Sequence, residues 1–311
     1  MTRVDLITGF LGAGKTTFIH RYLRWLRERG EDVLIIENEF GSVSVDSRLL
    51  RNEGCAIEDL AGVCMCCKGR DQFAAMLADA AARGGHRVLV EPSGIYDVDE
   101  FFSVMDEPRV RQGCEPGCVL AVVDARVPRD LSGESAHLMF TQLAAAGAIV
   151  LSKVQLQPPE AVDAAVAWLD ALVREGGGRS LTDGEVWRKD WDALTDADFA
   201  ALQSSGFHRD PHLHRPAAHD EIYSSCITAG LCADEADLRA RVTDLLASDR
   251  FGKVLRIKGH IRDLEKRWYE VNATRGELSV RPAPDIRRGV LVVIGRDLDE
   301  AALDGAFLPR P

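Results

Sequence analysis

The stretch that decides the fold of this chain is Gly9-Phe10-Leu11-Gly12-Ala13-Gly14-Lys15-Thr16, close to the amino terminus. It matches the phosphate-binding pattern G-x-x-x-x-G-K-[ST], which requires a strand before it and a helix after it. Both are indicated here. Residues 4–8 are mostly apolar, as in a buried strand, and residues 16–29 carry apolar side chains at helical spacing up to Gly30. The sequence therefore predicts a phosphate loop at the end of the first strand.

Each part of this loop has a chemical role toward a bound nucleotide. The small residues Gly12, Ala13 and Gly14 allow their backbone N–H groups to approach the phosphates. The N-terminus of the following helix adds an electric field that favours anions. Lys15 is expected to reach the β- and γ-phosphates, and the Thr16 hydroxyl is expected to ligate Mg²⁺.

A second functional segment is Glu91-Pro92-Ser93-Gly94, which follows the apolar strand predicted at residues 87–91. Open α/β sheets bind their ligands at the carboxyl ends of the strands. We therefore expect Glu91 to hold Mg²⁺ through a water molecule or to orient the attacking water, and the Gly94 N–H to sense the γ-phosphate. The plain alternative is a surface glutamate at the end of a strand.

Strand and helix patterns alternate through the first half of the chain, which predicts an α/β fold with a mostly parallel sheet covered on both faces. Further strands are predicted at 33–37, 56–60, 119–124, 148–152 and 185–187, and helices at 70–83, 135–146 and 159–175.

A second, smaller domain is predicted after a polar linker rich in proline and histidine. The expected division is a P-loop nucleotide-binding domain at 1–203, a linker at 204–219 and an α+β domain at 220–311. In the last of these, strands are predicted at 221–228, 253–258, 268–273 and 290–294, with helices at 235–247 and 297–307.

Composition excludes several classes of protein. The formal charge of −11 and the pI of about 5.3 argue against general binding of nucleic acid, which favours a basic face. No run of 18 apolar residues predicts a membrane span, and no secretory pattern precedes the first strand. Eight cysteines in 311 residues, three of them clustered, do not resemble a disulfide framework, so a cytoplasmic location is expected.

The clustered cysteines are Cys64, Cys66 and Cys67, in the pattern C-x-C-C. Thiolates select Zn²⁺, Cu(I) or similar ions over Mg²⁺ and Ca²⁺, and three protein ligands leave a fourth position open for exchange. Inert buried thiols are the alternative for this cluster. Cys114 and Cys118 are a loose candidate for a second pair of metal ligands, but ordinary cysteines beside a buried strand are the simpler explanation.

Two further groups of side chains carry weaker signals for metal binding. Glu37 and Glu39 follow the second strand, and together with Asp46 they form either part of a metal or nucleotide-sensing site or a solvated acidic loop. The linker histidines are expected either to collect a metal or to be ordinary polar linker residues: His208, His212, His214 and His219.

Taken together, GFLGAGKTT, IENEFGSVSVD, CMCC, EPSG and a separate C-terminal domain resemble the CobW/YjiA-type P-loop GTPases, over residues 4 to about 307. The resemblance implies GTP hydrolysis at the phosphate loop, zinc or another transition metal at the cysteines, and a C-terminal domain that helps to meet a client protein. It further implies that Glu91 belongs to the hydrolytic site and that Glu37 is an additional metal ligand. The implied nucleotide residues are Gly12, Gly14, Lys15, Thr16, Thr17, Ser152 and Lys153.

The chain departs from the family pattern in three places. After the strand at 148–152 the family has Asn-Lys-x-Asp or a variant with Ser or Thr first, whereas this chain has Ser152-Lys153-Val154-Gln155. A carboxylate accepts from both N1–H and N2–H₂ of guanine, while an amide offers one acceptor and one donor, so ATP use stays open. Val63 replaces a frequent glycine, and Ser42 replaces a frequent glutamate.

These features favour a nucleotide-hydrolysing metallochaperone that binds GTP, Mg²⁺ and Zn²⁺ and delivers metal to a client metalloprotein. The alternative is a metal-sensing regulatory protein whose slow hydrolysis times its association with a partner. A P-loop kinase acting on a small molecule is the third hypothesis. The sequence leaves open the metal, the client and whether the chain forms a homo-oligomer.

Overall fold

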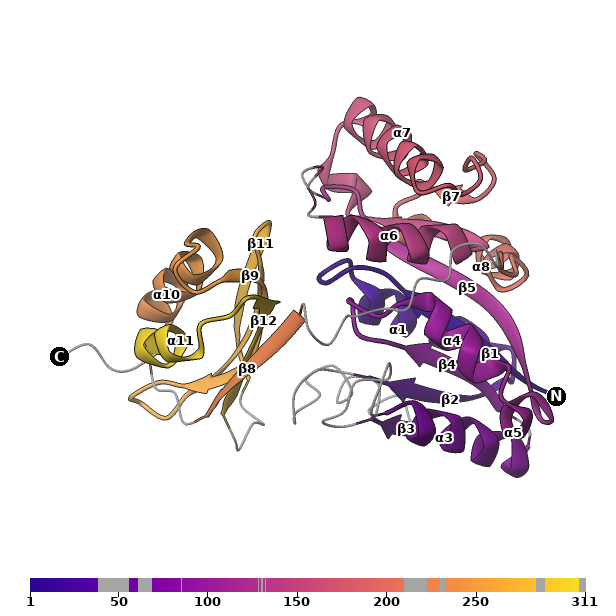
Figure 1. Cartoon of the computed structure of the whole chain (residues 1–311), viewed down its shortest axis with the longest axis horizontal. Helices are drawn as coiled ribbons and strands as arrows, with labels where there is room; N and C mark the ends of the chain where they lie inside the picture. Colours follow the sequence, from indigo (N-terminus) through magenta and orange to yellow (C-terminus); the bar gives the residue numbers. More distant parts are fainter. Residues whose placement is uncertain are drawn as a thin grey trace. The chain divides into compact units, whose positions relative to one another are not determined.

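The computed structural model describes residues 1–38, 56–60, 69–209, 223–229, 233–283 and 289–307, apart from residues 85, 128, 130 and 132. The described residues form two compact units, one ending at residue 209 and the other spanning 223–307 (Figure 1). None of the described helices combines the length and the apolar character that crossing a membrane would require.

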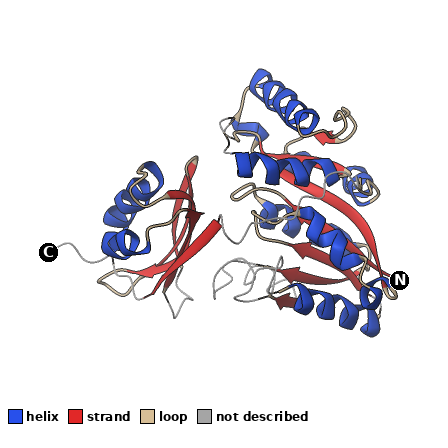
Figure 2. Cartoon of the chain, in the orientation of Figure 1, coloured by secondary structure: helices blue, strands red, loops and turns tan. Residues whose placement is uncertain are grey.

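The first unit contains a seven-stranded sheet in the order β3-β2-β4-β1-β5-β6-β7, and each neighbouring pair is parallel. Figure 2 shows its strands flanked by helices. This confirms the α/β class that the alternation predicted. The strands are β1 (Thr2–Thr8), β2 (Asp32–Glu37), β3 (Ala56–Asp59), β4 (His86–Glu91), β5 (Cys114–Asp124), β6 (Ala148–Ser152) and β7 (Val186–Trp187).

Helices pack on both faces of this sheet and form two separate apolar cores. One core contains α1 and α8, and the other contains α3, α4, α5, α6 and α7 (Figure 1). Two of these helices, α4 and α8, begin at capping residues, Asp97 and Thr195, whose side chains accept from backbone N–H groups of the first turn. The helices are α1 (Lys15–Glu28), α3 (Arg70–Arg83), α4 (Val98–Met105), α5 (Pro108–Arg111), α6 (Gly133–Ala145), α7 (Pro159–Glu175) and α8 (Asp196–Gln203).

The strand order places the predicted phosphate loop at a topological switch point. From β1 the chain crosses to β2 and β3, returns to β4 beside β1, and then continues on the other side with β5. Ligands bind outside the carboxyl ends of the strands at such a reversal. Residues 9–14 follow β1 at this point, so the topology and the motif indicate the same edge.

A β-bulge in β5 is built around a buried carboxylate. Val4 pairs with Pro116 but Leu6 pairs with Val119, so β5 carries one extra residue opposite Asp5. The Cys118 N–H donates to Asp5 Oδ1 at 3.0 Å. A Cβ on Gly117 would lie 2.0 Å from the same oxygen, which explains the glycine.

The bulge also separates the two cysteines of β5. Residues four apart on a regular strand share a face, but Cys114 lies in one core and Cys118 in the core on the opposite face. Both are buried, and burial raises the pKa of each thiol. The structural explanation for this pair is therefore correct, and the two sulfur atoms cannot share a metal ion.

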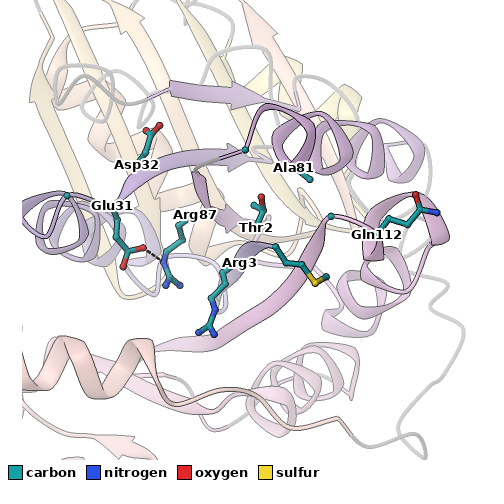
Figure 3. A pocket seen from close by; sticks show the side chains of 11 residues that line it. Thr2, Arg3, Glu31, Asp32, Ala81, Arg87 and Gln112 are labelled. Atoms are coloured by element: carbon teal, nitrogen blue, oxygen red, sulfur yellow. Dashed lines mark hydrogen bonds and ion pairs between the residues drawn. The ribbon is translucent and has the colours of Figure 1, made fainter.

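Asp5 is the centre of a buried polar network on the α1 face of the sheet. Its carboxylate accepts from Arg87 Nη1 at 2.9 Å and from the Tyr22 hydroxyl at 3.1 Å, and its side chain is fully buried. Arg87 also donates from Nε to Glu31. Figure 3 shows Arg87 and Glu31, with Thr2 and Arg3, lining a cavity of ≈ 640 Å³. This cavity lies at the amino ends of the strands, away from the phosphate loop.

We predict that Arg87→Leu destabilises the first unit by about 3–5 kcal/mol, because it leaves a buried carboxylate without its ion partner. Denaturant unfolding followed by tryptophan fluorescence measures this loss. Arg83→Leu is the matched control, since the pair of Arg83 with Glu58 is exposed and its loss should change the midpoint little. Equal midpoints for the two variants would contradict the account.

The second unit is an antiparallel sheet in the order β11-β10-β9-β12-β8, and α10 and α11 share its apolar core. The sequence predicted each element except β11, whose burial alternates weakly. The elements are β8 (Tyr223–Ala229), α10 (Glu235–Ala247), β9 (Lys253–Arg262), β10 (Trp268–Thr274), β11 (Glu277–Pro282), β12 (Val290–Arg296) and α11 (Glu300–Phe307).

The start of the expected linker packs on the first unit. Phe207 forms a β-bridge with Ala146, and His208 N–H donates to the Ala145 carbonyl at 2.9 Å. His208 Nε2 lies 2.9 Å from Glu185 Oε1, so this histidine has a structural role. His212, His214 and His219 lie outside the described residues.

Candidate functional site

The phosphate loop owes its shape to backbone conformations that favour glycine. Gly9, Gly12 and Gly14 have φ angles of 144°, 77° and 100°. Gly14 is the N-cap of α1, and its carbonyl accepts from the Phe18 N–H at 3.0 Å, which starts the helix. Lys15 Nζ donates to the Gly9 carbonyl at 2.9 Å, so the ammonium lies back across the loop that it is expected to serve. The arrangement is a glycine-rich turn with a buried cation folded back across it.

The first turn of α1 is tied to the end of β4. Thr16 Oγ1 donates to Glu91 Oε1 at 2.7 Å. A hydroxyl and a carboxylate at this separation are oxygen ligands of the kind that Mg²⁺ takes beside phosphates, directly or through water. The two residues that the sequence assigned to the magnesium site are therefore neighbours, although 75 positions separate them.

Glu37 lies next to Glu91 in the sheet. The two residues are partners in the parallel register of β2 and β4, and the Asn38 N–H donates to the Glu91 carbonyl at 2.9 Å. Glu37 is buried at 3% exposure. Its carbonyl accepts from the Leu60 N–H at 3.0 Å, and Asn38 Nδ2 donates to the Leu60 carbonyl at 3.3 Å. The end of β2 thus connects Glu91 to the residue at which the chain enters the cysteine segment.

The segment after Glu91 packs closely against the phosphate loop. A Cβ on Gly94 would lie 2.6 Å from the Leu11 nitrogen and 2.8 Å from its Cα. Gln142 of α6 holds the segment from below, since its Nε2 donates to the carbonyls of Gly94 and Tyr96 at 3.5 and 3.3 Å. Gly94 is therefore needed for close approach, whatever ligand the loop binds.

We predict that Gly94→Ala weakens nucleotide binding about tenfold or more, because overpacking of about 1–3 kcal/mol displaces the loop at Leu11. Titration with a fluorescent nucleotide measures the change. Gly184→Ala is the control, as a Cβ there meets nothing within 4 Å. Unaltered affinity in Gly94→Ala would show that the loop does not depend on this contact.

On the other side of the phosphate loop, the turn after β6 is held by a cluster of charges. Lys153 adopts a left-handed conformation with φ 58°, and its Nζ donates to the Gly12 carbonyl at 3.3 Å and to Asp124 Oδ2 at 2.8 Å. Ser152 Oγ donates to the Val123 carbonyl at 3.4 Å. Both expected base-site residues therefore lie beside the loop, fixed to the ends of β5 and β6.

Asp124 is the residue that orders this cluster. It accepts from the N–H, Nε and Nη2 of Arg126 as well as from Lys153. Burial opposes its ionisation, but the hydrogen bonds from Arg126 and Lys153 outweigh burial and lower the pKa of the carboxyl below 3.8. Asp124 is therefore an ionised acceptor throughout the physiological range.

The lowered pKa of Asp124 sets the sign of a pH effect. Its contribution to the free energy of unfolding is complete above the ordinary pKa of about 4 and is lost as the pH falls through the lower folded-state pKa. We predict that the free energy of unfolding of wild type exceeds that of Asp124→Asn by an amount that is constant from about pH 5 to 7 and shrinks below about pH 4. Denaturant titrations across this range measure it. Asp163→Asn, from an exposed pair with Arg188, should show almost no gap. A pH-independent gap for Asp124→Asn would contradict the assignment.

Trp191 joins the two sides of the site. Its Nε1 donates to the Leu151 carbonyl at 2.9 Å, and its ring meets Phe18 edge-on at 5.5 Å between centroids. A Cβ on Gly14 would lie 3.2 Å from Trp191 Cη2. The indole therefore packs between the phosphate loop, α1 and the end of β6.

The predicted cysteine cluster and the acidic residues after β2 fall outside the part of the chain that the structure describes. Cys64, Cys66, Cys67, Glu39 and Asp46 lie outside the described residues, as do Ser42 and Val63. Within the described part of the chain, no group of three or more His, Cys, Asp or Glu side chains is arranged to hold a metal ion.

Sequence reasoning missed Asp124, Gln142 and Trp191. Asp124 ends a predicted strand, so the argument that selected Glu91 could have found it. Trp191 approaches Gly14 across 177 positions, and Gln142 supports Gly94 from a helix 48 positions away. Neither contact leaves a pattern in the local sequence.

Comparison with known proteins identifies two matching families. Residues 3–176 match the CobW/HypB/UreG nucleotide-binding domain, and residues 222–308 match the cobalamin synthesis protein CobW C-terminal domain. The chain is 32% identical over 216 residues to the zinc chaperone YeiR of Escherichia coli, which covers 68% of this chain and 65% of YeiR. It is 30% identical to the zinc chaperone CobW of a Sinorhizobium species, covering 97% and 95% of the two chains. The zinc chaperone YjiA of Escherichia coli is 28% identical over 82% of this chain and 80% of YjiA.

Proposed function

The chain belongs to the CobW/HypB/UreG family of P-loop GTPases, and we propose that it uses GTP hydrolysis to deliver zinc, or a similar transition metal, to a client metalloprotein. The metal is the cargo and is held by Cys64, Cys66 and Cys67. Thiolates fit this cargo because they select Zn²⁺ and Cu(I) over Mg²⁺. The relatives named as zinc chaperones make zinc the first candidate.

In this proposal the nucleotide lies along the phosphate loop. The N–H groups from Gly12 to Thr17 bind the phosphates, and Lys15 turns from the Gly9 carbonyl toward the β- and γ-phosphates. Thr16 would ligate Mg²⁺ and Glu91 would hold it through a water molecule. When bound, the ion would neutralise charge on the phosphate oxygens. Glu91 also orients the attacking water, and Gly94 N–H contacts the γ-phosphate.

One observation carries the coupling between nucleotide and metal. Thr16 bonds Glu91, Glu91 is the register partner of Glu37, and Glu37 bonds Leu60. Cys64 follows Leu60 by four positions. Loss of the γ-phosphate changes the surroundings of Thr16 and Glu91, so it acts on the strand ends that carry the cysteine segment. Glu37, buried at the same edge, is the proposed additional ligand.

The test is a zinc titration against a competing chelator, with the protein empty, with Mg²⁺ and GDP, and with Mg²⁺ and a non-hydrolysable GTP analogue. We expect zinc affinity to differ about 5- to 150-fold between the two nucleotide states, the usual range of such coupling. Cys66→Ala should lower zinc affinity at least about tenfold in every state.

Cys226→Ala is the matched control, since Cys226 is buried in the core of the second unit and should leave zinc affinity unchanged. Full zinc binding in Cys66→Ala would remove the cysteine assignment. Equal affinities in the GDP and GTP-analogue states would remove the coupling and would favour the metal-sensing regulatory protein in place of the chaperone.

A further inference from the structure

We propose that the base site of this chain holds the purine ring by packing and does not read its hydrogen-bonding edge, so that its substrates are purine nucleoside triphosphates as a class, GTP among them. This inference rests on the proposed nucleotide site. It concerns the turn after β6, the one-turn helix η1 (Val154–Leu156) that follows, and the segment around Trp191.

The turn after β6 is firmly placed beside the phosphate loop. Lys153 Nζ bonds the Gly12 carbonyl, and Trp191 bonds the Leu151 carbonyl while its ring reaches Gly14. In this proposal, the base of a nucleotide whose phosphates lie in the loop packs against this turn. Lys153 and Trp191 are both only partly buried, and the indole N–H is already used.

The carboxylates of these two segments have partners within the chain. Asp124 accepts from Arg126 and Lys153. Asp190 Oδ1 caps η2 (Trp191–Ala193) by accepting from the Asp192 N–H, and Asp192 Oδ1 accepts from Arg21 Nη2 at 2.5 Å. The three carboxylates of these segments are thus each engaged within the chain, and the side chain that follows Val154 is the exposed amide of Gln155.

An exposed amide cannot discriminate strongly between purines. It offers one acceptor and one donor, and rotation of the group exchanges them. Guanine presents N1–H and N2–H₂, hypoxanthine presents N1–H without the amino group, and adenine presents an acceptor at N1 beside an amino donor. The amide of Gln155 can accept from N1–H and donate to O6 of guanine or hypoxanthine, and it can donate to N1 and accept from the 6-amino group of adenine. The 2-amino group of guanine therefore adds little, whereas a site built to pair with a substrate group rejects the analogue without it about 10⁴- to 10⁵-fold.

The experiment compares the affinities of GDP, IDP and ADP with Mg²⁺, by competition against a fluorescent nucleotide, in wild type, Gln155→Asp and Gln157→Asp. In wild type we expect the affinities for GDP and IDP to differ about tenfold or less, which is the range that one neutral hydrogen bond contributes. Gln155→Asp should raise the preference for GDP over IDP by at least about tenfold, because the carboxylate accepts from both guanine donors.

Gln157→Asp adds the same charge two residues further along, where the amide bonds the Leu156 carbonyl, and should leave the preference unchanged. A wild-type preference above tenfold for GDP over IDP or ADP overturns the proposal. So does an equal gain in Gln157→Asp, or no gain in Gln155→Asp. Lys15→Ala tests the proposed nucleotide site separately. If GDP binding survives in this variant, the assignment of the phosphate loop is wrong, whatever the outcome for the base site.

Discussion

The hydrogen bond between Thr16 and Glu91 is the contact on which the rest of the site depends. It joins the first turn of the helix after β1 to the end of β4, and so fixes the phosphate loop against the sheet. The parallel sheet makes this contact available, because all its strands present their carboxyl ends at one edge. The strand order reverses at β1, which is where open sheets of this kind bind their ligands. A nucleotide at this edge therefore touches both the loop and the strands that carry the other functional residues.

The two sides of the nucleotide site differ in how they are held. On the β4 and β2 side, Glu91 and Glu37 end neighbouring strands, and Asn38 and Leu60 hold these ends together through two backbone hydrogen bonds and one from the Asn38 side chain. In the proposed coupling, this side transmits changes at Glu91 along the sheet edge toward Leu60. On the β5 and β6 side, Asp124 and Trp191 lock the turn with side-chain contacts. That side is suited to holding a base in place, while the β4 and β2 side is suited to responding to the γ-phosphate.

The sequence allowed the architecture and much of the site to be predicted, because both follow from local patterns. A glycine-rich loop between a strand and a helix predicts β1, α1 and the phosphate site, and a carboxylate after an apolar strand predicts Glu91. The contacts that complete the site join distant segments, such as Trp191 with Gly14 and Gln142 with Gly94, and local periodicity does not encode them. The bulge in β5 is a further example. Residues four apart on a regular strand share a face, whereas the extra residue of β5 opposite Asp5 puts Cys114 and Cys118 on opposite faces.

Linkage gives the most direct test of coupling across the edge of this sheet. If nucleotide state changes zinc affinity, zinc must change nucleotide affinity by the same factor. Isothermal titration of the non-hydrolysable GTP analogue, with Mg²⁺ and with or without saturating Zn²⁺, measures that factor independently. The account predicts a change of about 5- to 150-fold that disappears in Cys66→Ala. Identical GTP-analogue affinities with and without zinc would contradict it.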